Sequence, residues 1–92
     1  MHDLLPNGSV VLLNQSDHRF MIYGRVQMDK ESGKLYDYAG CPYPEGAQDT
    51  SEVFLFNNDD IRMVFFLGFQ DFEELAYRNA IREALEKKKS DA

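Results

Sequence analysis

The amino-acid sequence predicts an α+β fold, with a small five-stranded antiparallel sheet followed by one C-terminal helix. The chain has 92 residues, which suits a single domain over 1–92. Between about residues 9 and 67, five short apolar stretches are separated by turn-forming residues. From about 71 to 88 the pattern changes to that of a charged, amphipathic helix. Sequential strands with short links favour antiparallel pairing, which places the fold in the α+β class.

The predicted strands are short and bounded by turn residues; they cover 10–13, 18–26, 35–39, 53–56 and 61–67. Asn57 can cap a single helical turn before the last strand, with Asp60 three residues on. A helical turn at this place is typical of small SH3-like barrels. We therefore expect an SH3-like barrel with an appended helix, in preference to an open meander backed by the helix.

The stretch 18–26 alternates, which indicates one buried and one exposed face. Phe20, Ile22 and Val26 fall on one face, and Arg25 falls on the other. Ile22, and Ile61 in the last strand, are therefore expected in the core.

The segment 41–46 contains two prolines within four residues, which argues against regular structure there because each proline lacks a backbone donor. Rigid aromatic and proline side chains lose little entropy on association. The residues of this region that we expect to bind a partner are Tyr36, Tyr38, Pro42, Tyr43 and Pro44. The alternative is a stiff lid over one end of the barrel.

The predicted helix begins near Asp71 and carries two apolar stripes. The first stripe suits packing on the sheet and comprises Phe72, Leu75 and Ala76. The second is rotated by about a third of a turn and comprises Tyr77, Ile81, Ala84 and Leu85. We expect Tyr77, Ile81 and Leu85 to form a partner-binding ridge or a homodimer contact. The alternative is a twisted contact of the whole helix along a curved barrel.

Composition excludes several function classes. The net charge of −6 argues against nucleic-acid and anionic-membrane partners. The apolar run 63–67 is far shorter than the roughly 20 residues of a membrane helix. One cysteine cannot form an internal disulfide, so nothing indicates an oxidising compartment. Because the sequence also shows no targeting segment, we expect a soluble cytoplasmic protein.

No motif in the sequence predicts catalysis, a cofactor or a metal site. Cys41 has no histidine close in sequence, and Asp59 and Asp60 lack the spacing and glycine of a calcium loop. Asp37 lies between two tyrosines in a strand, where a structural hydrogen bond to a loop is the expected role. We therefore expect a protein that is not an enzyme.

Several segments resemble the domain-of-unknown-function family 4176. They are LPNGSVVLL at 5–13, MIYGR at 21–25 and YDYAGCPYPEG at 36–46, with further matches at 54–57, 60–61, 64 and 66–69. The resemblance spans about residues 4–76, and the YDYxGCPYPEG block is its most specific part. The helix beyond Tyr77 lies outside it.

The resemblance implies a small cytoplasmic accessory protein of Gram-positive type VII secretion. Its partner would be the helical N-terminal LXG region of a secreted toxin, for which it would act as a chaperone or targeting adaptor. An immunity protein against a co-encoded toxin is the alternative. A small-barrel ribonuclease is less favoured, because residues 1–70 hold five basic and ten acidic residues.

Overall fold

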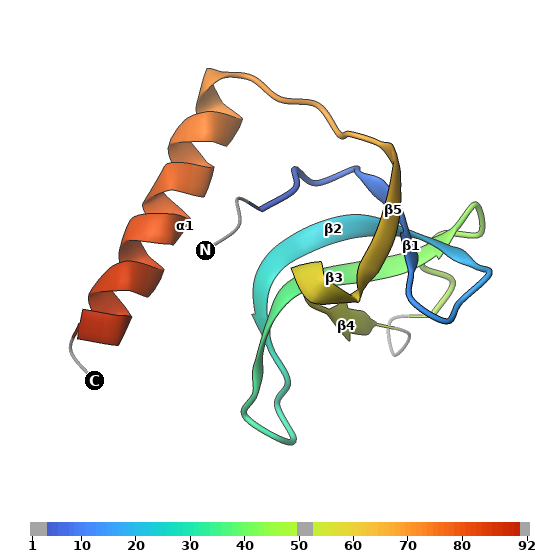
Figure 1. Ribbon diagram of the computed structural model, residues 1–92, viewed down its shortest axis with the longest axis horizontal. Helices are drawn as coiled ribbons and strands as arrows, with labels where there is room; N and C mark the ends of the chain where they lie inside the picture. Colours follow the sequence, from blue (N-terminus) through green and yellow to red (C-terminus); the bar gives the residue numbers. More distant parts are fainter. Residues whose placement is uncertain (1–3, 50–52, 91–92) are drawn as a thin grey trace.

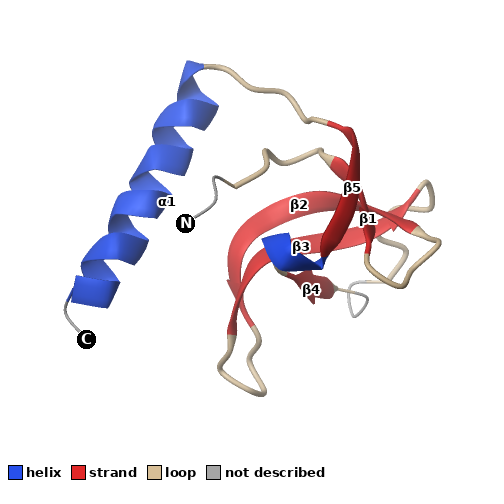
Figure 2. Ribbon diagram, viewed as in Figure 1, coloured by secondary structure: helices blue, strands red, loops and turns tan. Residues whose placement is uncertain are grey.

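The computed structural model describes residues 4–49 and 53–90, which form a five-stranded sheet and a long helix (Figures 1 and 2). The elements are β1 (Val10–Leu13), β2 (Arg19–Met28), β3 (Leu35–Tyr43), β4 (Phe54–Phe56), the 3₁₀ turn η1 (Asn58–Asp60), β5 (Ile61–Phe66) and α1 (Phe72–Ser90). Neighbouring strands are antiparallel, in the order β4-β3-β2-β1-β5. The predicted α+β fold is confirmed.

The sheet is open, so the predicted SH3-like barrel does not close. β4 and β5 lie at opposite ends of the strand order and, in the part of the chain that the structure describes, do not pair with each other. Closing a barrel requires the two edge strands to meet in register along their length. β4 has only three residues, and two register shifts interrupt the pairing of β5 with β1. Such shifts increase the local twist of an edge strand.

The core lies on one face of the curved sheet, beneath the N-terminal segment, and we call this the inner face. Its buried cluster comprises Leu4, Val11, Phe20, Ile22, Tyr38 and Phe56. Ile22 is fully buried, as predicted, whereas Ile61 packs against the cluster from the edge strand and is partly buried. The Tyr38 and Phe56 rings lie 5.6 Å apart and join β3 to β4 through this core.

β2 contains an irregularity that moves Arg25 to the inner face. Ile22 pairs with Gly40 but Gly24 pairs with Ala39, so one residue of β2 is left over. An extra residue reverses the alternation beyond it. Arg25 therefore lies opposite Tyr38 and is 7% exposed, which contradicts its predicted place on the outward face.

β3 continues through the segment in which the prolines were predicted to prevent regular structure. It runs to Tyr43, and Pro42 lies opposite Phe20 of β2. β4 pairs with β3 only as far as Gly40. A proline is tolerated in a strand where one side has no neighbouring strand, and Pro42 lies in such a stretch.

The predicted helical turn before the last strand is present as η1. The carboxylate of Asp60 accepts a hydrogen bond from the Asn57 N–H at 2.9 Å. Asp37 in β3 accepts one from the Asn58 N–H at 2.9 Å, and the Asp37 N–H donates to Asn57 Oδ1 at the same distance. Asp37 thus ties η1 to the sheet, which is a structural role.

The face of α1 that packs toward the sheet is not the predicted one. The side chains that are half-buried have the spacing of one helical face: Glu74, Arg78, Ile81 and Leu85. The stripe expected to pack on the sheet is exposed, with Phe72 at 88% and Leu75 at 49%. Ala76 is exposed as well.

A polar clasp formed by Arg25, Glu74 and Arg78 sets this rotation of the helix. Arg25 Nη1 and Nη2 donate to the two carboxylate oxygens of Glu74, at 2.5 and 2.7 Å. Arg78 donates to the Leu4 carbonyl at 2.9 Å, so the N-terminal segment joins the helix to the core. Because an unpaired charge inside a protein is costly, the buried Arg25 requires Glu74 to face inward.

Candidate functional site

The predicted tyrosine and proline residues do not form one surface. Tyr38 is fully buried in the core and not exposed as the partner-binding prediction expects. Its hydroxyl accepts a hydrogen bond from the Leu5 N–H at 2.9 Å and donates to Asn58 Oδ1. Tyr38 therefore links the N-terminal segment, β3 and η1 inside the core.

The remaining residues of that group are spread along β3. Tyr36 is half-buried near one end, where the Lys34 Nζ lies 5.2 Å from its ring. Tyr43 is 40% exposed at the other end, roughly 20 Å away at about 3.3 Å per residue. Pro42 beside it is half-buried, and Pro44 is exposed.

The structure joins Tyr43 to residues from three other parts of the chain in a cleft of about 490 Å³. We call it the outer cleft; it is lined by Gly8, Val10, Arg19, Met21, Tyr43, Phe65 and Phe66. Strand pairing explains the set, because Val10 lies opposite both Met21 and Phe66, and Arg19 lies opposite Tyr43. The Arg19 guanidinium carbon stands 4.0 Å from the centre of the Phe65 ring.

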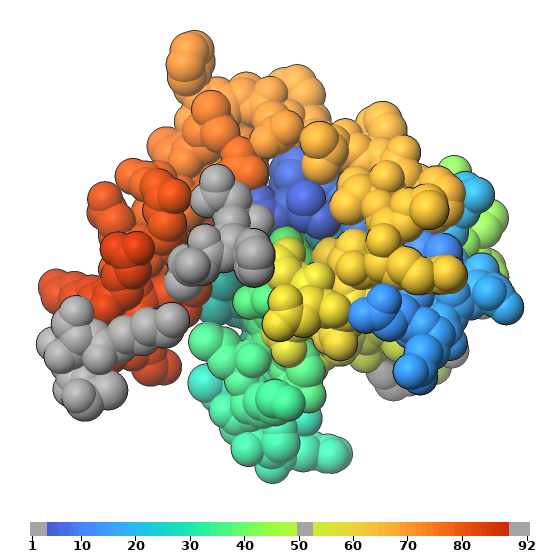
Figure 3. Space-filling model, in the orientation of Figure 1, coloured from blue at the N-terminus to red at the C-terminus, as the bar shows by residue number. Residues whose placement is uncertain are grey.

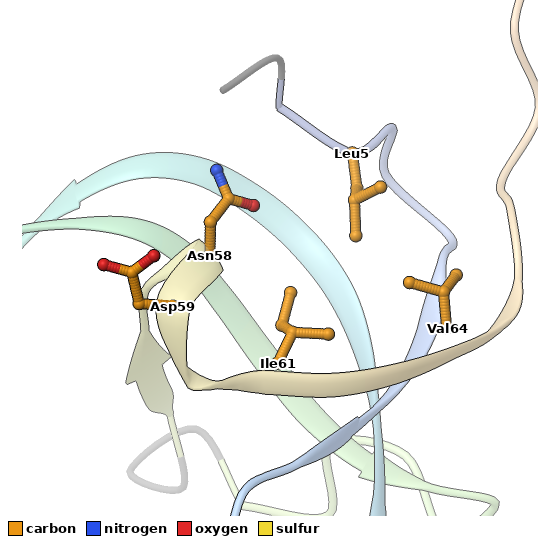
Figure 4. Close-up of a pocket in the computed structure, with 5 residues that line it drawn as sticks. All are labelled: Leu5, Asn58, Asp59, Ile61 and Val64. Atoms are coloured by element: carbon orange, nitrogen blue, oxygen red, sulfur yellow. The ribbon is translucent and has the colours of Figure 1, made fainter. Parts of the chain in front are cut away.

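A second cleft of about 450 Å³ lies on the inner face, and we call it the inner cleft (Figure 4). Leu5, Ile61 and Val64 point toward the space between the N-terminal segment and β5, and η1 closes one end with Asn58 and Asp59. A register shift between Val64 and Phe66 places these two side chains on opposite faces of the sheet. β5 therefore lines both clefts.

β5 and the segment after it form an exposed apolar strip that the sequence pattern did not predict. The strip comprises Met63, Val64, Phe65, Phe66, Leu67, Phe69 and Phe72, which are 42–88% exposed. It occupies the upper part of the surface in Figure 3, in yellow and orange. At about 200 Å² per ring, the four phenylalanines alone leave roughly 500 Å² accessible. The largest apolar patch of a monomeric protein is of similar size and is often functional, so the strip is a candidate contact surface.

A run of consecutive apolar residues is the usual sign of a strand buried on both faces. Nothing in the run 63–67 says that its strand ends up at the edge of an open sheet. The exposed strip is therefore a property of the topology.

The predicted helical ridge lies against the sheet. Ile81 is half-buried and packs on the core cluster, and Leu85 is half-buried four residues on. Tyr77 is 59% exposed, but its ring centre lies 5.4 Å from the Arg25 guanidinium carbon. Ile81 therefore belongs to the intramolecular packing and not to a free ridge.

The titratable groups with shifted pKa values lie outside both clefts. Burial raises the pKa of the Tyr38 hydroxyl above its usual 10.0. The pKa of Glu45 is lowered by its own backbone N–H and further by His18, whose Nε2 is 3.0 Å away. Cys41 is buried, and within residues 4–49 and 53–90 no three metal-ligating side chains gather at one point.

The fold and the two clefts define a small, open-sheet α+β protein with an extensive exposed apolar surface. The chain belongs to the family described as Domain of unknown function (DUF4176), which matches residues 4–77 and confirms the family resemblance. No curated protein and no solved structure matches it. In the described ranges, no helix combines the length and the apolar character needed to cross a bilayer.

Proposed function

We propose that this chain is a non-enzymatic accessory protein that binds another protein at the outer cleft. The observation that carries the proposal is the cleft's lining, which combines Tyr43, Arg19 and two phenylalanines. Tyrosine and arginine are enriched among the residues that dominate binding energy at protein interfaces. The cleft also continues into the exposed strip, which widens the available apolar contact.

The partner that we propose is the helical LXG region of a type VII secretion toxin, bound in the cytoplasm before export. Support comes from the family resemblance, together with the shape of the surface. An amphipathic helix binds by laying its apolar face into an apolar groove, and the outer cleft provides Val10, Met21 and Phe66 for such a face. The role would be that of a chaperone or targeting adaptor.

An immunity protein that neutralises a co-encoded toxin is the second candidate. It is favoured by the net charge of −6, with Asp59 at the rim of the inner cleft. Such a surface suits a basic toxin domain.

Copurification with separate toxin fragments tests both functions. The chaperone proposal expects capture of the N-terminal helical half of the toxin, and the immunity alternative expects capture of the C-terminal toxic half. Capture of neither half by the wild-type chain contradicts both.

A substitution then tests the outer cleft. Tyr43→Ala is expected to weaken capture about thirtyfold, as the loss of an aromatic anchor commonly does. Tyr23→Ala is the matched control, because Tyr23 is 43% exposed and does not line the cleft. Equal affinities of the two variants would place the partner elsewhere.

A further inference from the structure

We infer that two copies of this chain associate by pairing their β5 strands edge to edge, which goes beyond the proposed function. β5 is the last strand in the sheet order, with β1 on one side. In the described part of the chain no strand pairs with its other side, so that side presents backbone groups able to bond to another strand.

The two edges of the sheet differ in how they are protected. β4 has three residues, and its Phe56 is buried in the core. β5 has six residues, none of them buried. Short edge strands limit pairing with other chains, whereas a long, exposed apolar edge favours it. Of the two edges, β5 is therefore the one open to association.

β5 also lacks the charges that usually block such pairing. Between Met63 and Gln70 there is no charged residue, in a chain whose charged fraction is 28%. Lysine and other charges on an edge strand are the common protection against pairing. Here the one charged residue of β5 is Arg62, which donates to the Ser16 carbonyl at 3.1 Å.

The segment that follows β5 is held on the β1 side of the strand, at Gly68. The Gly68 N–H donates to Ser9 Oγ at 3.0 Å, on the β1 side. A Cβ on Gly68 would lie 2.0 Å from the Asn7 carbonyl oxygen, so only glycine allows this close approach. Beyond Gly68 the chain runs away from the sheet toward α1 (Figure 1).

A second copy is the occupant that suits this edge. A two-fold contact places a surface against itself, so that surface must be self-complementary. Uncharged apolar residues meet this condition, whereas most of this chain, with a net charge of −6, would repel its own copy. Phe65 and Phe66 of β5 are 43% and 62% exposed, so at about 200 Å² per ring they would add roughly 200 Å² of apolar contact to the backbone pairing.

Antiparallel pairing of two β5 strands would build a continuous ten-stranded sheet. The side chains of the added strand would fall alternately on its two faces. Those on one face would meet Val64 and the inner cleft, and those on the other would meet Phe66 and the outer cleft. Both clefts would then lie beside the two-fold axis.

Sedimentation equilibrium of the full chain over a range of concentrations tests the inference. The wild-type chain is expected to dimerise, and Val64→Lys is expected to weaken dimerisation at least tenfold. Leu35→Lys is the matched control, because Leu35 is 40% exposed, lies in β3 and receives the same charge. A monomer at all concentrations overturns the inference. So does a dimer that withstands Val64→Lys, or that Leu35→Lys weakens equally.

Cross-linking keeps the test decisive if Val64→Lys fails to fold. In a Cys41→Ala background, which removes the single cysteine, a cysteine is placed at Val64 or, as control, at Tyr23. A short bismaleimide is expected to link two Val64→Cys chains and not two Tyr23→Cys chains. Equal yields at the two positions would overturn the inference. Tyr43→Ala should leave the cross-link intact, so the partner site and the dimer edge fail independently.

Discussion

The β2–β3 half of the sheet and the β5 edge use apolar residues in opposite ways. In the first half, Ile22 and Tyr38 are fully buried and the Tyr38 hydroxyl is hydrogen-bonded on both sides. In the second, Phe66 and Phe69 are 62% and 80% exposed. A residue contributes to folding in proportion to the apolar area that it removes from water. The β2–β3 half therefore carries the stability, and the β5 edge leaves its apolar area exposed, where the proposed contacts would use it.

The helix α1 also has one part that packs on the core and one part that is exposed. α1 is joined to the β2–β3 half by Arg25 and by the packing of Ile81 on the core. Its first turn contains Phe72, the last residue of the exposed strip, which is 88% exposed. One end of the helix thus continues the exposed apolar surface, while its middle packs on the core.

The largest effect is expected from truncating the core. Ile22→Ala should lower the free energy of unfolding by about 4 kcal/mol, because it leaves a cavity in a fully buried site. Val64→Ala should lower it by less than about 1 kcal/mol, since Val64 is 42% exposed. Urea denaturation of both variants measures the difference. Similar losses would show that the two halves contribute equally to stability.

Breaking the polar clasp should have the next largest effect. Glu74→Ala leaves Arg25 buried without its partner and should cost about 3 kcal/mol. Glu73→Ala, one residue earlier and exposed, should change stability by less than about 0.5 kcal/mol. Chemical denaturation followed by circular dichroism checks both. Equal effects would mean that the helix is held by its apolar contacts alone.

Tyr38→Phe should cost about 1.5 kcal/mol at neutral pH, because the Leu5 N–H and Asn58 Oδ1 lose a buried partner. It should also change how the free energy of unfolding depends on pH. The folded state raises the pKa of Tyr38, so this contribution is fully present below the unfolded value of 10.0 and is lost as the pH rises above it. Urea denaturation below and above pH 10.0 measures this. Above pH 10.0 the free energy of unfolding should fall less in Tyr38→Phe than in the wild-type chain. The same fall with pH in the variant and the wild-type chain would contradict this prediction.

The smallest effect on stability is expected in the exposed strip. Phe72→Ser should change the free energy of unfolding by less than about 0.5 kcal/mol, since the side chain is 88% exposed. It should instead reduce the binding of a hydrophobic dye to the folded chain, because the strip loses one of its rings. A large loss of stability would show that the strip is part of the core.

Local sequence signals predicted several parts of the fold because their causes lie within a few residues. The helical turn η1 follows from Asn57 and Asp60, three residues apart, and the carboxylate of Asp71 accepts a hydrogen bond from the Glu74 N–H at 3.0 Å at the start of α1. The α+β class and the burial of Ile22 follow from the order of strands and their alternation. Of the predicted tyrosine and proline group, Tyr43 lines the outer cleft.

The burial of Arg25, the rotation of α1 and the exposure of β5 were decided by the tertiary structure, because each depends on contacts between residues far apart in the chain. One extra residue in β2 reversed the alternation and buried Arg25, although Gly24 in the strand is a local sign of such an irregularity. Arg25 then required Glu74, 49 residues away, and so turned α1 away from its more apolar face. The exposure of β5 depends on the sheet staying open, which no periodicity within residues 61–66 can encode. Which apolar residues form the core and which form a contact surface is therefore settled by strand order and by one buried ion pair.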